Sequence, residues 1–104
     1  MSDRVIRDFL LGFIKIHILH HAARERIFGQ EFRSELMRHG YEISFGTLYP
    51  IFHKLEKDGF LSSRKENVMG KVRKYYTATK KGKSVLGEAK RKARELFDEL
   101  HEND

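Results

Sequence analysis

The sequence of 104 residues contains no cysteine, no tryptophan and a single proline. Without cysteine the chain has no disulfide bonds, thiolate metal ligands or cysteine nucleophile, which is compatible with a reducing cell interior. A chain of this length forms one small domain with a modest core. We therefore expect it to gain stability by associating with a partner subunit.

Long apolar stretches are also missing. The most apolar run, VIRDFLLGFIKIHIL at 5–19, is interrupted by Arg7, Asp8 and Lys15 and lacks a small-residue cleavage site. It is shorter than the roughly 20 residues that a membrane-spanning helix needs. We expect a cytoplasmic protein with no membrane partner.

Motifs of catalysis and metal binding are sparse. There is no nucleophile elbow, no glycine-rich phosphate loop and no carboxylate pair in an apolar setting, so we predict no enzymatic activity and no cofactor. His17, His20 and His21 share one helix face, which is a conceivable metal site, but the sequence places no further ligand beside them. We expect partly buried or solvent-facing histidines there, and no metal.

What the sequence does contain is a helical pattern followed by a hairpin pattern. Apolar spacing predicts a first helix over 4–21, a loop over 22–29 and a second helix ending at Gly40, with Phe32, Leu36 and Met37 facing inward. Two strand-prone runs, 61–67 and 71–79, are joined by a turn near Gly70. A last helix follows, with Thr79 as its N-cap.

The third helix begins after Ser44, a good N-cap, and ends at Gly59. Ile43 and Leu48 have the spacing of a hydrophobic staple around that cap. The only proline, Pro50, lies inside this helix and cannot donate to the carbonyl of Gly46. We predict a loosened first turn whose backbone can be approached closely by a binding partner at Gly46; the alternative is that Pro50 merely fills a gap between helices.

Positive charge is concentrated in one segment. Of the net charge of +6, residues 61–83 alone supply +7, from eight basic side chains and one acidic side chain. Such a stretch, with Tyr75 and Tyr76 inside it, suits contact with a phosphate backbone. Read alone, it is equally compatible with a solvated basic hairpin.

The order of elements decides between these two interpretations. Helix, helix, turn, helix and a basic hairpin is the order of a winged helix-turn-helix, in which the third helix enters the major groove. We therefore expect a mainly α fold with a small β-hairpin: a DNA-binding winged helix-turn-helix domain over 1–78, with its wing at 61–77, and a long C-terminal dimerisation helix over 79–104. The expected partner is double-stranded DNA.

The motifs GTLYPIFHKLEKDGFL and GKVRKYYTATKKGK together resemble the PadR family of transcriptional regulators. The resemblance covers about residues 5–87 and implies a homodimeric DNA-binding repressor or activator. Two positions depart from the family pattern, Phe45 and Val72. From the helix faces, the charge and the resemblance together we predict DNA contacts at Ser44, Gly46, Thr47, Tyr49, His53, Lys54, Arg64, Lys65, Lys71, Arg73 and Lys74.

The last helix carries a heptad seam that its own chain can cover only with the first helix. Because the first helix is itself apolar over more than half of its surface, we predict a two-fold dimer built from both helices. The predicted interface residues are Phe9, Phe13, Ile16, Leu86, Ala89, Ala93, Leu96, Phe97 and Leu100.

Two alternatives remain open at this point. A winged helix can act as a protein-protein interaction module without sequence-specific DNA binding, and Phe45 would then be its anchor. Alternatively, the regulator responds to a small aromatic effector in a pocket lined by Phe9, Phe13, Ile16 and Phe97. Ordinary packing of the interface by these residues is the stronger expectation.

Overall fold

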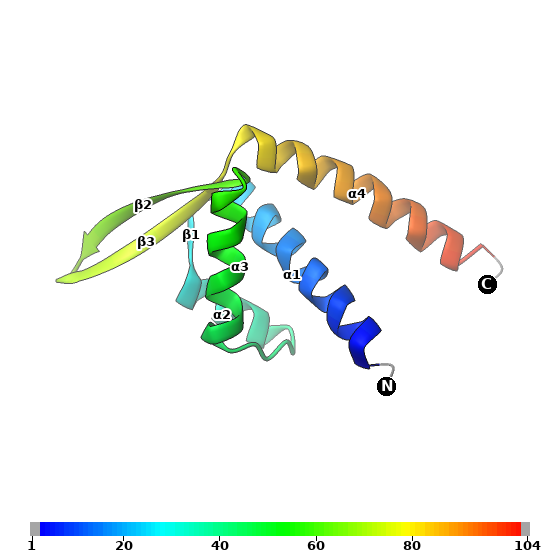
Figure 1. Cartoon of the computed structure of the whole chain (residues 1–104), viewed down its shortest axis with the longest axis horizontal. Coiled ribbons are helices and arrows are strands. Elements are labelled where there is room, and N and C mark those ends of the chain that lie inside the picture. The colour runs from blue at the N-terminus through cyan, green and yellow to red at the C-terminus, as the bar shows by residue number, and fades with distance from the viewer. Residues whose placement is uncertain (1–2, 103–104) are drawn as a thin grey trace.

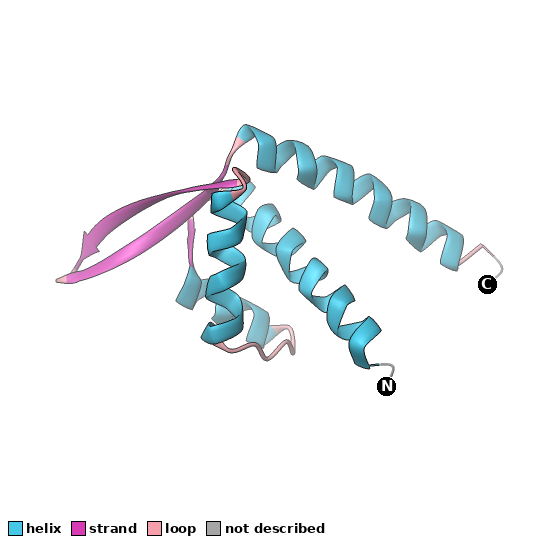
Figure 2. Cartoon of the chain, viewed as in Figure 1, coloured by secondary structure: helices cyan, strands magenta, loops and turns pink. Residues whose placement is uncertain are grey.

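A computed structural model describes residues 3–102, and Figure 1 shows a bundle of helices from which a hairpin projects on the side away from both ends of the chain. Helices dominate and the strands are confined to that side (Figure 2), which confirms the expected fold class. The outer limits of the two predicted domains, residues 1 and 104, lie outside the described residues. The elements are α1 (Asp3–Arg24), β1 (Ile27–Phe28), α2 (Gly29–Arg38), α3 (Phe45–Lys57), β2 (Leu61–Val68), β3 (Lys71–Ala78) and α4 (Lys80–Leu100).

The core forms where the C-terminal half of α1 meets α2, α3, the sheet and the start of α4. Phe52 of α3 is fully buried at its centre, and its ring contacts those of Phe32 and Tyr76 at centroid distances of 5.8 and 4.7 Å. Burying one such side chain contributes about 2–3 kcal/mol. The other buried apolar residues are Ile14, Ile18, Leu19, Ala22, Ile27, Leu36, Ile43, Leu48, Ile51, Leu55, Leu61 and Leu86.

Three local predictions in the first half of the chain are wrong. α1 continues to Arg24 instead of ending near His21, and the following segment is not all loop, because Ile27–Phe28 form β1 and pair with β3. Met37, expected to face inward, is 47% exposed. Phe32 and Leu36 define the buried stripe of the short α2, and Met37 falls one residue, or about 100°, away from it.

Both ends of α3 are as predicted. The Ser44 hydroxyl oxygen accepts a hydrogen bond from the Thr47 amide at 3.2 Å, and Ile43 and Leu48 are both buried beside this cap. Gly59 follows the helix with φ of +85°, a left-handed conformation that glycine adopts at little cost. Local chemistry therefore fixes where α3 starts and stops.

The hairpin has the predicted turn. β2 and β3 pair from Leu61 with Ala78 to Val68 with Lys71, which leaves a two-residue loop of Met69 and Gly70. Both loop residues have positive φ, 52° and 83°, as the tight hairpin turns that match strand twist require. β1 adds a short third strand, so the sheet order is β1-β3-β2.

The start of α4 is tied to the end of α3. Thr79 caps α4 as predicted, accepting from the Gly82 amide at 3.0 Å, and its hydroxyl donates to the Gly59 carbonyl at 2.6 Å. α4 packs on α1 near the sheet, and the two helices then diverge toward the chain ends (Figure 1). Among the helices of residues 3–102, none combines the length and apolarity that crossing a membrane requires.

Candidate nucleic-acid interface

α3 presents one buried face and one open face. Leu48, Phe52 and Leu55 hold the buried face against the core, together with Ile51. The residues on the opposite side of the helix are exposed, namely Gly46, Pro50, His53, Lys54 and Lys57. The last three have side chains able to donate to bases or phosphates. The centre of this face is low, because Gly46 and Pro50 project little beyond the backbone.

Gly46 and Pro50 lie in open space. Pro50 is exposed, so it does not fill a gap between helices, and the alternative explanation for the proline is wrong. A Cβ built on Gly46 meets only the Ser44 hydroxyl oxygen, at an ordinary 3.7 Å. Because Pro50 has no amide hydrogen, the Gly46 carbonyl lacks its helical donor. Among residues 3–102, therefore, no contact requires glycine at position 46.

A ladder of stacked rings runs along one flank of the open face. The rings of Phe45 and Tyr49 are nearly parallel, 13° apart with centroids at 5.1 Å, and His53 continues the stack from Tyr49 at 6.4 Å. The Arg33 guanidinium lies over the Phe45 ring at 4.7 Å, and its Nε donates to the Ile43 carbonyl at 2.7 Å. α2 thereby supports the side chains that α3 presents.

Gly29, the first residue of α2, leaves room for the Tyr49 ring because it has no side chain. A Cβ at Gly29 would lie 2.6 Å from Cε1 of the Tyr49 ring, well inside contact distance. Neither Gly29 nor Arg33 is recognisable as a site residue from the sequence, since nothing in their local sequence reveals a contact with α3. These two residues add α2 to the candidate site as the element that positions its aromatic side chains.

The base of the hairpin is fastened to α3 through Glu56. Its carboxylate accepts from the Ser63 hydroxyl and pairs with Lys74 Nζ at 3.1 Å. The Ser63 hydrogen bond, with help from Lys74, lowers the Glu56 pKa although desolvation opposes it. For Lys74, desolvation lowers the pKa, but Glu56 and Tyr76 together outweigh it and raise the pKa. Lys74 therefore holds the hairpin in place instead of extending freely to a phosphate.

The outer face of the sheet carries a second stack that the sequence analysis missed. The Arg26 guanidinium lies 3.9 Å from the centre of the Tyr75 ring and forms an ion pair with Glu66. Phe28 meets Tyr75 edge to face at 5.4 Å, and Arg73 lies over Phe28 at 4.6 Å. Arg73, a predicted DNA contact, is thus partly engaged in stiffening the hairpin.

The other predicted contact residues divide by element. Arg64, Lys65 and Lys71 are exposed along the hairpin. Thr47 is partly exposed and its hydroxyl accepts from that of Ser44 at 3.2 Å, whereas Lys54 pairs at 3.4 Å with Asp58, the C-cap residue of α3. The structure thus has an open helix face and, extending from the end of the same helix, a cationic hairpin (Figure 1). This pair of surfaces suits a duplex groove and its flanking phosphates.

Comparison with known proteins identifies the family. Residues 18–88 match the sequence model of the transcriptional regulator PadR-like family. The chain belongs to this family. It is 44% identical over 95 residues to Transcriptional regulator Rv3488 of Mycobacterium tuberculosis, covering 91% of this chain and 89% of that protein. The chain is accordingly a transcriptional regulator, as the resemblance implied, and its family is one of regulators and not of enzymes.

Solved PadR structures share the fold. A PadR family transcriptional regulator from Eggerthella lenta superposes with a TM-score of 0.77 at 30% identity, covering 97% of this chain and 93% of that one. A PadR-like transcriptional regulator from Bacillus cereus gives a TM-score of 0.82 at 27% identity, covering 91% and 94% of the two chains. The likeness includes the long helices as well as the winged-helix elements.

In this PadR-like chain, the predicted interface residues differ in exposure. Phe9 and Leu100 are about two-thirds uncovered, at 60% and 66%, and every α4 residue from 91 to 100 is exposed. Phe13, Ile16 and Ala89 are partly covered within the chain. Leu86 is 7% exposed and belongs to the core of its own chain, so the expectation that it faces a partner is wrong.

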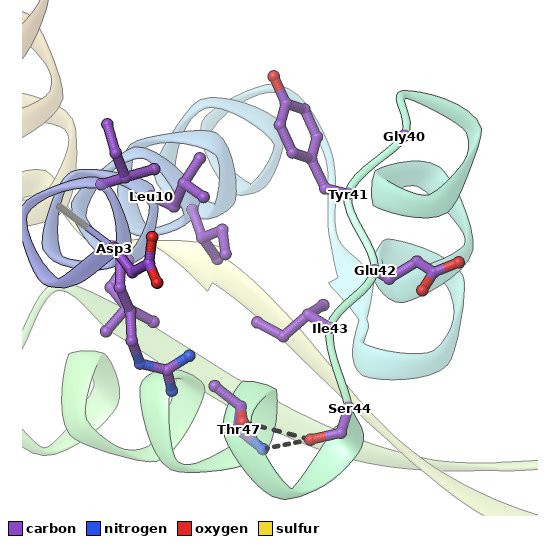
Figure 3. Close-up of a pocket in the computed structure, with 12 residues that line it drawn as sticks. Asp3, Leu10, Gly40, Tyr41, Glu42, Ile43, Ser44 and Thr47 are labelled. Atoms are coloured by element: carbon purple, nitrogen blue, oxygen red, sulfur yellow. Dashed lines mark hydrogen bonds between the residues drawn. The ribbon is translucent and has the colours of Figure 1, made fainter. Parts of the chain in front are cut away.

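A hollow of about 570 Å³ lies between the N-terminal half of α1 and the segment joining α2 to α3 (Figure 3). Leu10 and Ile43 give it apolar walls, and Ser44 and Thr47 of the α3 cap lie at its edge. None of the residues expected to line an effector pocket, Phe9, Phe13, Ile16 and Phe97, lines this hollow.

The histidines of α1 are packed among rings. His17 lies 4.4 Å from the Phe13 ring and 6.3 Å from His21, while His20 meets His21 edge to face at 5.1 Å. Burial, followed by the neighbouring histidine charges, lowers the pKa of His17, and burial and His21 lower that of His20. Within residues 3–102 there is no group of three or more histidine, aspartate or glutamate side chains placed to hold a metal ion.

Proposed function

We propose that this PadR-like regulator binds a near-palindromic DNA operator as a homodimer and represses transcription by occupying it. α3 enters the major groove and the hairpin follows the phosphate backbone. The observation that carries the proposal is the low, exposed face of α3 around Gly46, with the hairpin of residues 61–78 extending from the same core. Open helix amides at the capped end add partial positive charge toward the DNA.

The hairpin supplies the electrostatic part of binding. Arg64, Lys65 and Lys71 are exposed, and none of the ion pairs within residues 3–102 engages them. Lys74 and Arg73 keep the hairpin stiff by their contacts with Glu56 and Phe28. A stiff cationic strand pair lays its charges along the backbone with little loss of conformational freedom on binding.

A second copy of the chain fits the uncovered helix ends. Phe9 of α1 and Leu96, Phe97 and Leu100 of α4 leave apolar surface exposed where the two helices diverge. The first turns of α1 carry Arg4 and Arg7 but also Asp3 and Asp8, so their charges balance, and it is the exposed apolar surface that favours association across a two-fold axis. The pair of α3 helices then addresses half-sites in successive major grooves.

Response to a small aromatic effector is an elaboration of the same proposal. The rings of Phe9 and Phe13 lie next to each other on α1, tilted by 32° with centroids 5.9 Å apart, and Phe97 lies on the divergent half of α4. Phe9 and Phe97 are both more than half exposed within one copy, so we place an effector site lined by these rings at the proposed dimer interface. Titration of candidate aromatics, followed by NMR at the phenylalanine rings, tests this; perturbation confined to other parts of the chain would contradict it.

The deciding experiment is selection of bound sequences from a pool of random duplex DNA at two salt concentrations. We expect an inverted repeat with half-sites about one helical turn apart and an affinity that falls steeply with salt. Lys71→Ala should reduce the slope of log affinity against log salt by about 0.9 per subunit. Lys92→Ala, which removes an exposed charge from α4, serves as the matched control and should leave the slope unchanged.

Two outcomes would contradict the proposal. Salt-sensitive binding without an enriched sequence would reduce the protein to a general basic binder. Absence of binding would favour the protein-protein interaction module, with Phe45 as its anchor.

The dimer is tested separately by sedimentation equilibrium: Leu100→Glu should yield monomers, whereas Met37→Glu, at a similarly exposed apolar residue on α2, should not.

A further inference from the structure

Phe45 places an apolar ring at the N-terminal end of α3, the end that meets the groove in the proposed complex. It is the first residue of the helix, directly after the Ser44 cap, and its side chain is partly exposed instead of joining the core. A hydroxyl or amide at this point could hydrogen-bond to many base edges, whereas a phenyl ring can form only apolar contacts. The chemistry of position 45 therefore restricts what it can recognise.

Two neighbours hold the ring in one orientation. Tyr49, one turn later, stacks on it with an interplanar angle of 13°. The Arg33 guanidinium covers it at 4.7 Å, and Arg33 is itself fixed by the hydrogen bond from its Nε to the Ile43 carbonyl at 2.7 Å. A ring supported from two elements loses little freedom on binding, which is the condition for a discriminating contact.

The major groove offers such a ring one apolar target. Base edges there present hydrogen-bond donors and acceptors, except for the methyl group at C5 of thymine, which phenylalanine side chains contact in protein–DNA complexes. The low surface at Gly46, next in sequence, allows the start of α3 to come close enough for van der Waals contact.

We infer that Phe45 reads the 5-methyl group of a thymine in each operator half-site, and that Arg33 is the residue that positions the ring. The inference rests on the proposed binding of α3 in the major groove. It adds a base preference to that proposal and assigns a role to Arg33.

The test uses the full chain and its selected operator. Each thymine of the half-site is replaced by deoxyuridine, which removes the methyl group and keeps every hydrogen-bonding atom. For the wild type, one position in each half-site should weaken binding by about fourfold, the change expected for one methyl group removed from water. For Phe45→Ser, thymine and deoxyuridine at that position should bind equally well.

Cytosine and 5-methylcytosine at the same position separate the methyl group from the rest of the base. Their affinities should differ by the same factor of about four in the wild type and should be equal in Phe45→Ser. A methyl effect seen with 5-methylcytosine but absent with thymine would assign the contact to methylated DNA and overturn the thymine reading. Arg33→Ala keeps the ring and should reduce the thymine preference without abolishing binding.

Several results would overturn the inference while leaving the proposed function intact. One is sequence-specific binding that no deoxyuridine substitution weakens. Another is a methyl preference that survives Phe45→Ser, which would assign it to another side chain such as Thr47. Thermal unfolding of each variant controls for folding, since a partly exposed side chain should shift the midpoint little. Failure of the wild type to bind any DNA would instead reject the proposed function.

Discussion

The starts of α3 and α4 are built from the same parts and differ in the space around them. Each helix has a hydroxyl N-cap, Ser44 or Thr79, and each has a glycine in its first turn, Gly46 or Gly82. A Cβ at Gly82 would lie 2.1 Å from the backbone oxygen of Phe60, whereas a Cβ at Gly46 would meet nothing closer than 3.7 Å. The fold requires glycine at position 82, whereas at position 46 the described residues leave room for a side chain.

The hydrogen bonds around the two helix starts differ in the same way as the space around their glycines. The start of α4 is tied down by backbone contacts: Thr79 donates its amide to the Phe60 carbonyl at 3.1 Å, and Lys81 Nζ donates to the Asp58 carbonyl at 2.8 Å. The start of α3 faces solvent, and Pro50 removes one of its helical hydrogen bonds. The start of α4 is closed by contacts within its own chain, and the start of α3 is open to solvent.

The largest effect is a loss of stability, and we expect it at Gly82, where the surrounding space is closed. Gly82→Ala places a methyl group against the Phe60 carbonyl, which belongs to the backbone and cannot rotate away. The junction of α3, the hairpin and α4 must shift, and we expect the free energy of unfolding to fall by about 3 kcal/mol, at the upper end for overpacking. Urea unfolding measures this change.

Gly87 of the same helix is the matched control. A Cβ there meets only the flexible end of Arg91 at 3.8 Å. Gly87→Ala should therefore raise the free energy of unfolding by about 0.5–1 kcal/mol through helix propensity. Equal stability of the two variants would show that the Gly82 contact does not constrain the fold.

The second effect is expected in DNA binding and not in folding. Gly46→Val fills the open space with a side chain that the free protein accommodates, so stability should change by no more than about 0.5 kcal/mol. Operator affinity should fall by about tenfold or more, a cost of roughly 1.4 kcal/mol. Fluorescence anisotropy on the selected operator measures it. If stability and affinity fell together, Gly46 would be a structural glycine like Gly82.

Sequence reasoning succeeded where the determining contacts are local. The caps at Ser44 and Thr79, the left-handed Gly59 and the turn at Gly70 each depend on residues within a few positions of one another. Such features follow from backbone conformation and hydrogen-bonding capacity, which the sequence displays directly.

It failed where the contact joins distant parts of the chain. Gly29 and Tyr49 are 20 residues apart, and Gly82 meets Phe60 across the junction. The two-residue β1 has too few residues to show a strand pattern. Lys74 counted as a free cation in the sequence because its partner, Glu56, belongs to another element. Charge and periodicity place side chains on faces, but they do not reveal which groups already have partners.

A smaller effect is expected at the contact between α2 and α3. Gly29→Ala brings a methyl group against the Tyr49 ring, which is a side chain able to move. We expect the ring to leave its stack with Phe45 and His53, with a change in near-ultraviolet circular dichroism and a loss of operator affinity of about fivefold, or roughly 1 kcal/mol. Unchanged affinity would show that the aromatic ladder does not meet DNA.

The smallest effect is expected from the half-packed histidines of α1, which are neither as enclosed as Gly82 nor as open as Gly46. Burial, and then the charges of His21, His20 and His39, lower the pKa of His17 in the folded chain. Its proton is therefore bound more readily by the unfolded chain, whose histidine pKa is about 6.5, so stability present above that pH is lost as pH falls below it. The free energy of unfolding, measured in urea, should decrease as pH falls from about 7 to 5.5. Its slope against pH should correspond to the uptake of less than one proton on unfolding, and His17→Gln should flatten this slope. An unchanged slope in His17→Gln would mean that packing against Phe13 leaves the imidazole as free to protonate as in the unfolded chain.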